Sequence, residues 1–189
     1  MKPEQIDVVV LSHGHPDHIG GLLEDGKPLF PNARYLIGAS EYDFWSAANH
    51  TGDLEKFASL FRDYVVPLAD KTTFLKPGDE VASGIHAVEA YGHTPGHLGF
   101  RIEGGGKDLF FLGDCAHHHV ASLARPDWYC VFDVDPEKGA QTRARILDML
   151  ASERIAVSAY HMPFPSIGYV ERLSQHSYRW LPHTYQLDL

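Results

Sequence analysis

Apolar residues gather along this chain in short runs, separated by polar segments rich in glycine and proline. Runs of this kind, with many β-branched side chains, predict strands that are buried on both faces. The predicted strands cover residues 6–11, 33–38, 72–75, 85–91, 98–102, 109–112 and 155–158.

Three other segments have the spacing or the end signals of helices. The segment 53–64 repeats apolar residues every three or four positions, so that they line one face. Elsewhere a residue that can cap the first turn comes before the helix: Ser40 for 41–49, and Asp135 for a helix that begins at Pro136. Strands with covering helices predict an α/β fold.

The length and the net charge of the chain limit its domain organisation and the partners that it can bind. A chain of 189 residues favours one domain over residues 1–189. The net charge of -9, from 25 acidic and 16 basic residues, argues against a nucleic-acid partner, because phosphate backbones are held by clustered basic side chains.

Two further features bear on where the protein works. No apolar run approaches the roughly 18 residues of a membrane span, and the N-terminus lacks the apolar core of a signal peptide. We therefore expect a cytoplasmic protein with no membrane partner, in which Cys115 and Cys130 are free thiols.

The candidate chemistry begins directly after the first predicted strand. His13-Gly14-His15-Pro16-Asp17-His18 places four potential metal ligands within six residues, and a helix is expected to open near 19–23. Imidazole and carboxylate suit zinc, iron, manganese and cobalt. The alternative is a plain solvated loop, but packing gives no reason for three histidines and an aspartate at this density.

Three more ligand-type residues also follow predicted strands. His93 lies in a Gly-His-Thr-Pro-Gly-His stretch, Asp114 follows a strand and a glycine, and His161 comes after the strand at 155–158. Loops at strand ends build sites while the sheet holds them in place. The sequence therefore predicts that these side chains converge on the first loop.

The order HxHxDH, then His, then Asp, then His resembles the metallo-β-lactamase superfamily over nearly the whole chain. The resemblance implies an αβ/βα sandwich with a two-metal site. It implies that one metal is held by His13, His15 and His93, that the other is held by Asp17, His18 and His161, and that Asp114 bridges them. His97 is then expected to support the ligands from behind.

The resemblance also implies the chemistry. Two divalent ions, zinc first and iron, manganese or cobalt as alternatives, activate a bridging water to hydroxide near neutral pH. Asp17 and Asp114 are the candidate catalytic residues, because Asp17 can also shuttle a proton to the leaving group. The expected reaction is hydrolysis of a small molecule.

Two stretches resemble one branch of that superfamily, the branch with methyl parathion hydrolase and related lactonases. They are Ala159–Pro165 around His161, and the Ala116–Val120 stretch after the bridging aspartate. That branch implies small esters, lactones or organophosphates as substrates. The alternatives are a β-lactamase or a glyoxalase II-like thioesterase, and a truncated metal-binding domain without turnover.

Several aromatic residues are candidates for the substrate pocket. Phe164 follows His161 by three positions on a Pro-bounded loop, and Trp45 lies on a predicted helix. His117, in contrast, is expected to pack within its loop.

The start of the chain departs from the family pattern. Only eleven residues precede Ser12, so part of the family's N-terminal sheet is expected to be missing. Such a sheet has an open edge, which predicts pairing with a second copy of the chain.

Overall fold

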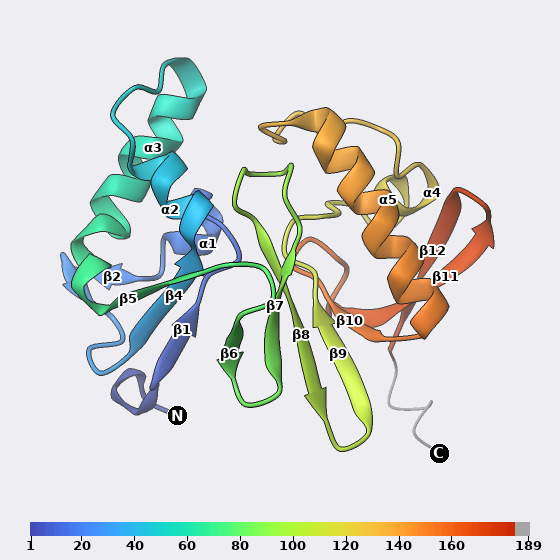
Figure 1. Cartoon of the computed structure of the whole chain (residues 1–189), viewed down its shortest axis with the longest axis horizontal. Coiled ribbons are helices and arrows are strands. Elements are labelled where there is room, and N and C mark those ends of the chain that lie inside the picture. Colours follow the sequence, from blue (N-terminus) through green and yellow to red (C-terminus); the bar gives the residue numbers. More distant parts are fainter. Residues whose placement is uncertain (184–189) are drawn as a thin grey trace.

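The computed structural model describes residues 1–183 and has four layers, with two sheets face to face and helices on both outer sides (Figure 1). The helices are η1 Pro3–Gln5, α1 Pro16–Ile19, α2 Ala39–Ser46, α3 Gly52–Tyr64, η2 Val66–Lys71, α4 Ala121–Ala124 and α5 Pro136–Glu153, where η marks a 3₁₀ helix. The strands are β1 Val8–Val10, β2 Leu23–Glu24, β3 Lys27–Pro28, β4 Arg34–Gly38, β5 Thr72–Leu75, β6 Glu80–Ala82, β7 Ile85–Glu89, β8 Leu98–Gly104, β9 Lys107–Phe111, β10 Ala156–Ser158, β11 Ile167–Ser174 and β12 Ser177–Pro182.

The two main sheets differ in size and in strand direction. The smaller has the order β1-β4-β5, and all its strands are parallel. The larger has the order β12-β11-β10-β9-β8-β7-β6, and only its β9–β10 pair is parallel. Strands β2 and β3 form a separate hairpin.

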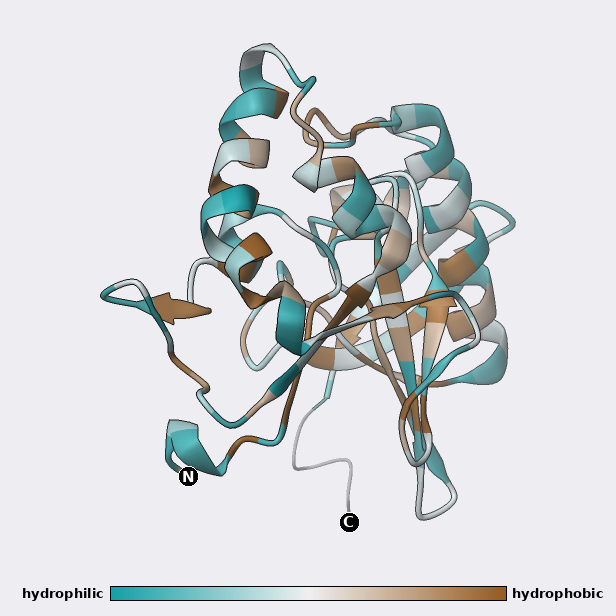
Figure 2. Cartoon of the chain, turned by 60° about the vertical axis from the view of Figure 1, so that its left-hand side comes forward, coloured by the Kyte–Doolittle hydropathy of each residue, from teal (hydrophilic) through white to brown (hydrophobic). Residues whose placement is uncertain are grey.

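The buried hydrophobic side chains form three clusters, one between each pair of adjacent layers. In β4, Tyr35 and Ile37 pack toward α2 and α3, while Leu36 between them packs toward the other sheet. This is the period of two that a strand imposes on its side chains. Figure 2 shows the result: the strands are mostly hydrophobic, whereas the helices carry both kinds of residue.

Strand direction explains where a site can form. β8 is antiparallel to both β7 and β9, and β9 is parallel to β10, so β7, β9 and β10 all run the same way. Their carboxyl ends therefore meet at one rim of the sandwich, at the upper edge of the sheets in Figure 1, where β1 and the loop after it also arrive.

Most predicted elements are confirmed, with differences at their ends. Ser40 does not cap α2, because β4 runs directly into the helix and Gly38 is the residue before its first turn. The helix expected near 19–23 is instead the single turn α1. Asp135 caps α5 as predicted, since its carboxylate accepts a hydrogen bond from the Lys138 N–H at 3.0 Å.

The C-terminal hairpin β11–β12 was not predicted. Its buried residues, such as Tyr178 and Trp180, alternate with more exposed ones, so it does not form the continuous apolar run of an interior strand. Both cysteines are free thiols. Within residues 1–183, no helix has the length and the apolar content needed to cross a membrane.

Candidate metal centre

The loop after β1 supplies the first group of side chains. Its backbone leaves the strand at Leu11, whose N–H donates to the Leu36 carbonyl, and turns into α1 at Pro16. His13 and His15 therefore point inward and are buried, whereas Asp17 is half-exposed on the first turn of α1.

The structure brings together all seven side chains that the sequence pointed to, in two groups. The ligand atoms of His13, His15 and His93 lie within 4.8 Å of one another. The same limit holds for the second group: Asp17, His18, Asp114 and His161.

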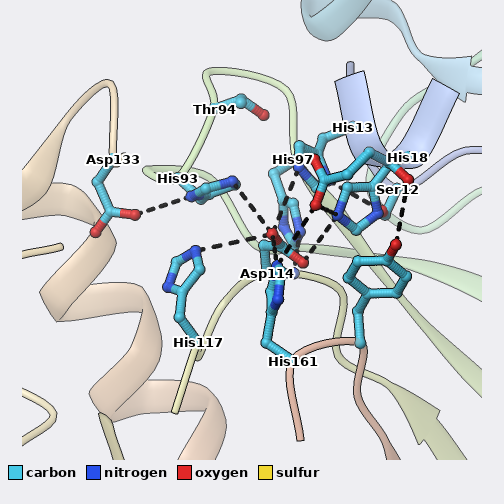
Figure 3. Close-up of polar contacts among 12 residues, drawn as sticks. Ser12, His13, His18, His93, Thr94, His97, Asp114, His117, Asp133 and His161 are labelled. Carbon is cyan, nitrogen blue, oxygen red and sulfur yellow. Dashed lines mark hydrogen bonds and ion pairs between the residues drawn. The ribbon is translucent and has the colours of Figure 1, made fainter. Parts of the chain in front are cut away.

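The carboxylate of Asp114 belongs to the second group and stands at the centre of the site (Figure 3). Within its own group it is 2.8 Å from His161 Nε2 and 3.2 Å from His18 Nε2. Toward the first group, Asp114 Oδ2 is 3.7 Å from His93 Nε2 and 3.9 Å from His13 Nε2. One carboxylate thus faces both sets of imidazoles, which is the place that a bridging ligand needs.

Several of the buried polar atoms at this point lack hydrogen-bond partners. Buried polar groups in proteins are normally satisfied, so a cluster of exceptions indicates that something else uses their lone pairs. Among the described residues the unpartnered atoms here are Nε2 of His13, His15, His18 and His93, Oδ1 of Asp114, and both ring nitrogens of His117. A donor set of neutral imidazoles around carboxylates fits divalent cations such as zinc.

Burial keeps the histidines in the form that can bind a metal. Desolvation, followed by the proximity of other imidazoles, lowers the pKa of His15 and of His93 to about 3. The same causes hold the pKa of His13 well below its ordinary value. Burial alone would raise the pKa of Asp114, but the neighbouring His18, His93 and His161 outweigh it and hold that pKa below its usual range. The first group therefore consists of neutral imidazoles, and they face an ionised carboxylate.

A second buried carboxylate orients His93. Asp133 Oδ1 lies 2.9 Å from His93 Nδ1, and Asp133 Oδ2 accepts a hydrogen bond from the Arg143 guanidinium at 3.1 Å. Arg143 also donates to the carbonyls of Cys115, Pro126 and Trp128, so it ties this carboxylate to the loop before α5. Asp133 was not predicted from the sequence, because it lies in a segment without a strand or a recognisable motif.

His97 is fully buried and holds the backbone beside the central carboxylate. Its Nε2 accepts a hydrogen bond from the Asp114 N–H at 3.0 Å, so its other ring nitrogen carries the proton and donates to the Ala90 carbonyl at 3.1 Å. A β-carbon on Gly113 would come within 2.5 Å of His97 Nε2. His97 thus acts on the position of Asp114 and lies in neither group of converging ligand atoms.

A pocket of about 510 Å³ opens directly onto the two groups. Besides the converging ligands and Pro16, its lining residues are Phe57, His117, Cys130 and Phe132. His117 does not pack within its loop as expected; it lines this pocket, with Nε2 at 3.8 Å from Asp114 Oδ2.

The two aromatic residues expected in the pocket lie elsewhere. Trp45 is fully buried under the loop after β1, because its indole N–H donates to Glu41 and its ring packs against His15. Phe164 is 96% exposed and does not belong to the pocket lining. Phe57 from α3 and Phe132 from the loop before α5 supply the aromatic wall in their place.

Comparison with known proteins agrees with this geometry. Residues 1–134 match a family model described as a beta-lactamase superfamily domain. The solved structure of the hydrolase AbOPH of the beta lactamase superfamily is similar with a TM-score of 0.92 and 29% identity, covering 98% of this chain and 67% of that chain. The lactonase AidC, described as a dizinc quorum-quenching enzyme with a product bound, is similar with a TM-score of 0.91 and 27% identity over the same shares.

Two further matches are less informative, because one shows the fold alone and the other covers only a short segment. AiiA of B. thuringiensis has a TM-score of 0.66 at 19% identity, over 86% of this chain and 58% of that chain. An uncharacterized protein of Caenorhabditis elegans is 46% identical over 55 residues, which is 28% of this chain and 14% of that protein. The chain thus spans about two thirds of AbOPH and AidC and a small part of this curated relative.

Proposed function

The chain belongs to the β-lactamase superfamily, and on that premise we propose that it is a hydrolase that depends on two divalent cations. One observation carries the proposal: unpartnered imidazole nitrogens converge from separate strand ends on the carboxylate of Asp114. Zinc is the first choice because imidazole and carboxylate suit it and because the similar AidC is described as a dizinc enzyme. Iron, manganese and cobalt suit the same donors.

Each of the two groups of converging side chains would bind one cation. His13, His15 and His93 would hold one cation, Asp17, His18 and His161 would hold the other, and Asp114 would serve both. Cations held in this way supply a water of lowered pKa and an electrophile for the oxygen of a carbonyl or phosphoryl group.

Asp17 is the residue proposed to move the proton. Its carboxylate lines the pocket, is 49% exposed, and has Oδ2 at 3.7 Å from His161 Nε2. From there it can take a proton from the attacking water and give it to the oxygen of the leaving group. One water is consumed, one carbon–oxygen or phosphorus–oxygen bond breaks, and the carboxylate returns to its ionised form.

The pocket favours small substrates with an apolar part. Phe57 and Phe132 offer aromatic surface on its wall, and no Lys or Arg belongs to its lining within residues 1–183. An uncharged ester, lactone or organophosphate fits such a wall better than a polyanion does. The hydrolase and the lactonase among the similar structures support the same class.

Metal content and turnover test the proposal together. The purified chain is assayed for bound metal per chain and for hydrolysis of a lactone, an aryl ester, a phosphotriester, a β-lactam and a thioester. We expect activity on one of the first three, loss of it on chelation, and its return with zinc, cobalt or manganese. Bound metal without any turnover would favour a metal-binding domain, and activity that survives complete removal of metal would overturn the proposal.

A further inference from the structure

Glu41 is a buried charged residue that the proposed chemistry does not use. It lies in the first turn of α2 and has no exposed surface. Among residues 1–183 no Lys or Arg forms an ion pair with it. A carboxylate buried without a cation is costly unless hydrogen bonds replace the lost water.

Four donors provide those hydrogen bonds. Glu41 Oε1 accepts from the Gly14 N–H at 2.8 Å and from the indole N–H of Trp45 at 2.7 Å. Glu41 Oε2 accepts from the Thr94 hydroxyl at 2.7 Å and from the Gly96 N–H at 2.9 Å. Three of these groups can only donate, so the arrangement suits an acceptor with two oxygens and no proton of its own.

Three of the four donors come from the two loops that carry the first group of histidines. Gly14 stands between His13 and His15, while Thr94 directly follows His93 and Gly96 lies two positions further on. The loops are some eighty residues apart in the sequence, and this one carboxylate bonds to both. A shift of either loop against the other therefore breaks at least one bond to Glu41.

The packing around Glu41 leaves little room for another arrangement. A β-carbon on Gly96 would lie 2.0 Å from the backbone nitrogen of Glu41. A β-carbon on Gly14 would lie 2.6 Å from the ring of Phe61 and 2.7 Å from that of Trp45. Both loops thus approach the helices at glycines, Gly14 against α2 and α3 and Gly96 against α2, and the carboxylate of Glu41 bonds to both loops.

We propose that Glu41 is a positioning residue: it fixes the spacing between the His13–His15 pair and His93, and so sets the affinity of the metal site that these three histidines form. Glu41 acts through two backbone N–H groups and one hydroxyl of the two loops, and it contacts neither metal nor substrate. The inference rests on the proposed function, because it needs His13, His15 and His93 to hold a cation.

The competing view is that Glu41 only stabilises the fold. Both views expect a variant at Glu41 to be less stable. They differ in the metal site: a stabilising role leaves its affinity and ligand geometry unchanged in the folded fraction, whereas a positioning role changes both. Zinc affinity from competition with a chelator and the visible absorption spectrum of the cobalt-substituted protein separate the two views.

The primary variant is Glu41→Gln, which keeps the size of the side chain and turns one acceptor oxygen into a donor NH₂. We expect folded protein whose first zinc binds about tenfold or more weakly, in the range that supporting residues of metal ligands have, with a cobalt spectrum that differs from that of the wild type. Unchanged zinc affinity and an unchanged cobalt spectrum, with only a lower unfolding temperature, overturn the proposal.

A matched pair of variants tests the same bond if Glu41→Gln fails to fold. Thr94→Val removes the hydroxyl and keeps the shape, whereas Thr94→Ser keeps the hydroxyl. We expect weaker zinc binding and an altered cobalt spectrum for Thr94→Val, and wild-type values for Thr94→Ser. Equal zinc affinities for the two variants overturn the proposal. A wild-type chain that binds no zinc overturns the proposed function as well, and this result is separate from any effect of the variants.

Discussion

His93 Nδ1 lies 2.9 Å from Asp133 Oδ1, and the other nitrogen of the same ring faces Asp114. An ionised carboxylate can only accept, so Nδ1 carries the proton and Nε2 presents its lone pair to the centre. The Arg143 guanidinium on the other oxygen of Asp133 keeps that carboxylate in place. A buried Arg–Asp–His series thus fixes both the tautomer and the direction of one proposed ligand.

Removal of this support should weaken metal binding. We predict that Asp133→Ala lowers zinc affinity by about 10–100-fold, because His93 loses the partner that orients it. Chelator competition measures the change. The control is Asp127→Ala in the same loop. Its exposed carboxylate pairs with Arg125, and its loss should leave zinc affinity as it is. Equal affinities for the two variants would contradict the role given to Asp133.

Loss of the central carboxylate should affect both proposed cations. Asp114 faces both groups of imidazoles, so we predict that Asp114→Ala lowers the metal content from two ions per chain to less than one and abolishes hydrolysis. Elemental analysis of the dialysed variant beside the wild type checks this. A variant that keeps two ions would mean that Asp114 is not shared.

The metal-free protein should lose stability in mild acid. The pKa values of His15, His93 and His97 are lowered to about 3, mainly by burial, whereas the unfolded chain titrates near 6.5. Between these values the unfolded state binds more protons than the folded state. The contribution of these histidines to the free energy of unfolding is therefore fully present above pH 6.5 and is lost as the pH drops toward 3. Each group adds a slope of up to about 1.4 kcal/mol per pH unit. Urea denaturation of the metal-free chain from pH 8 to pH 4 measures it; a flat or rising stability in acid would contradict the burial of neutral histidines.

A methyl group at Gly113 should disturb the centre as well as the backbone. Gly113 has φ +54, and an added β-carbon would meet the ring of His97 that holds the Asp114 N–H. We predict that Gly113→Ala lowers the free energy of unfolding by clearly more than the roughly 1 kcal/mol of the backbone strain alone. The matched control is Gly106→Ala, which also has a positive φ but open space around it. Urea denaturation compares the two, and equal losses would rule out a contact with His97.

The aromatic pocket wall should contribute to substrate binding. We predict that Phe132→Ala lowers kcat/KM for an apolar lactone or aryl ester by roughly fivefold, about 1 kcal/mol of lost apolar contact, chiefly through a higher KM. Phe164→Ala is the control, because that side chain is exposed outside the pocket lining. An effect of Phe164→Ala as large as that of Phe132→Ala would mean that the pocket extends over the 162–166 loop.

The strands, the main helices and the set of converging residues could be predicted from the sequence alone. Short apolar runs fixed where β1, β7, β9 and β10 lie, and a ligand-type residue stands at or shortly after the end of each. These features can be read locally, because the apolar run of a buried strand and the polar loop after it lie within about ten residues of each other in the sequence.

The tertiary structure alone decided what supports and surrounds those residues. Glu41 and Asp133 look like ordinary surface acids in the sequence, and only folding brings them to Gly14 and His93. Trp45 was expected on the pocket wall but is fully buried, and Phe132 is part of that wall instead. Contacts between residues 27 to 55 positions apart depend on how the layers pack, and no local pattern of residue types records that packing.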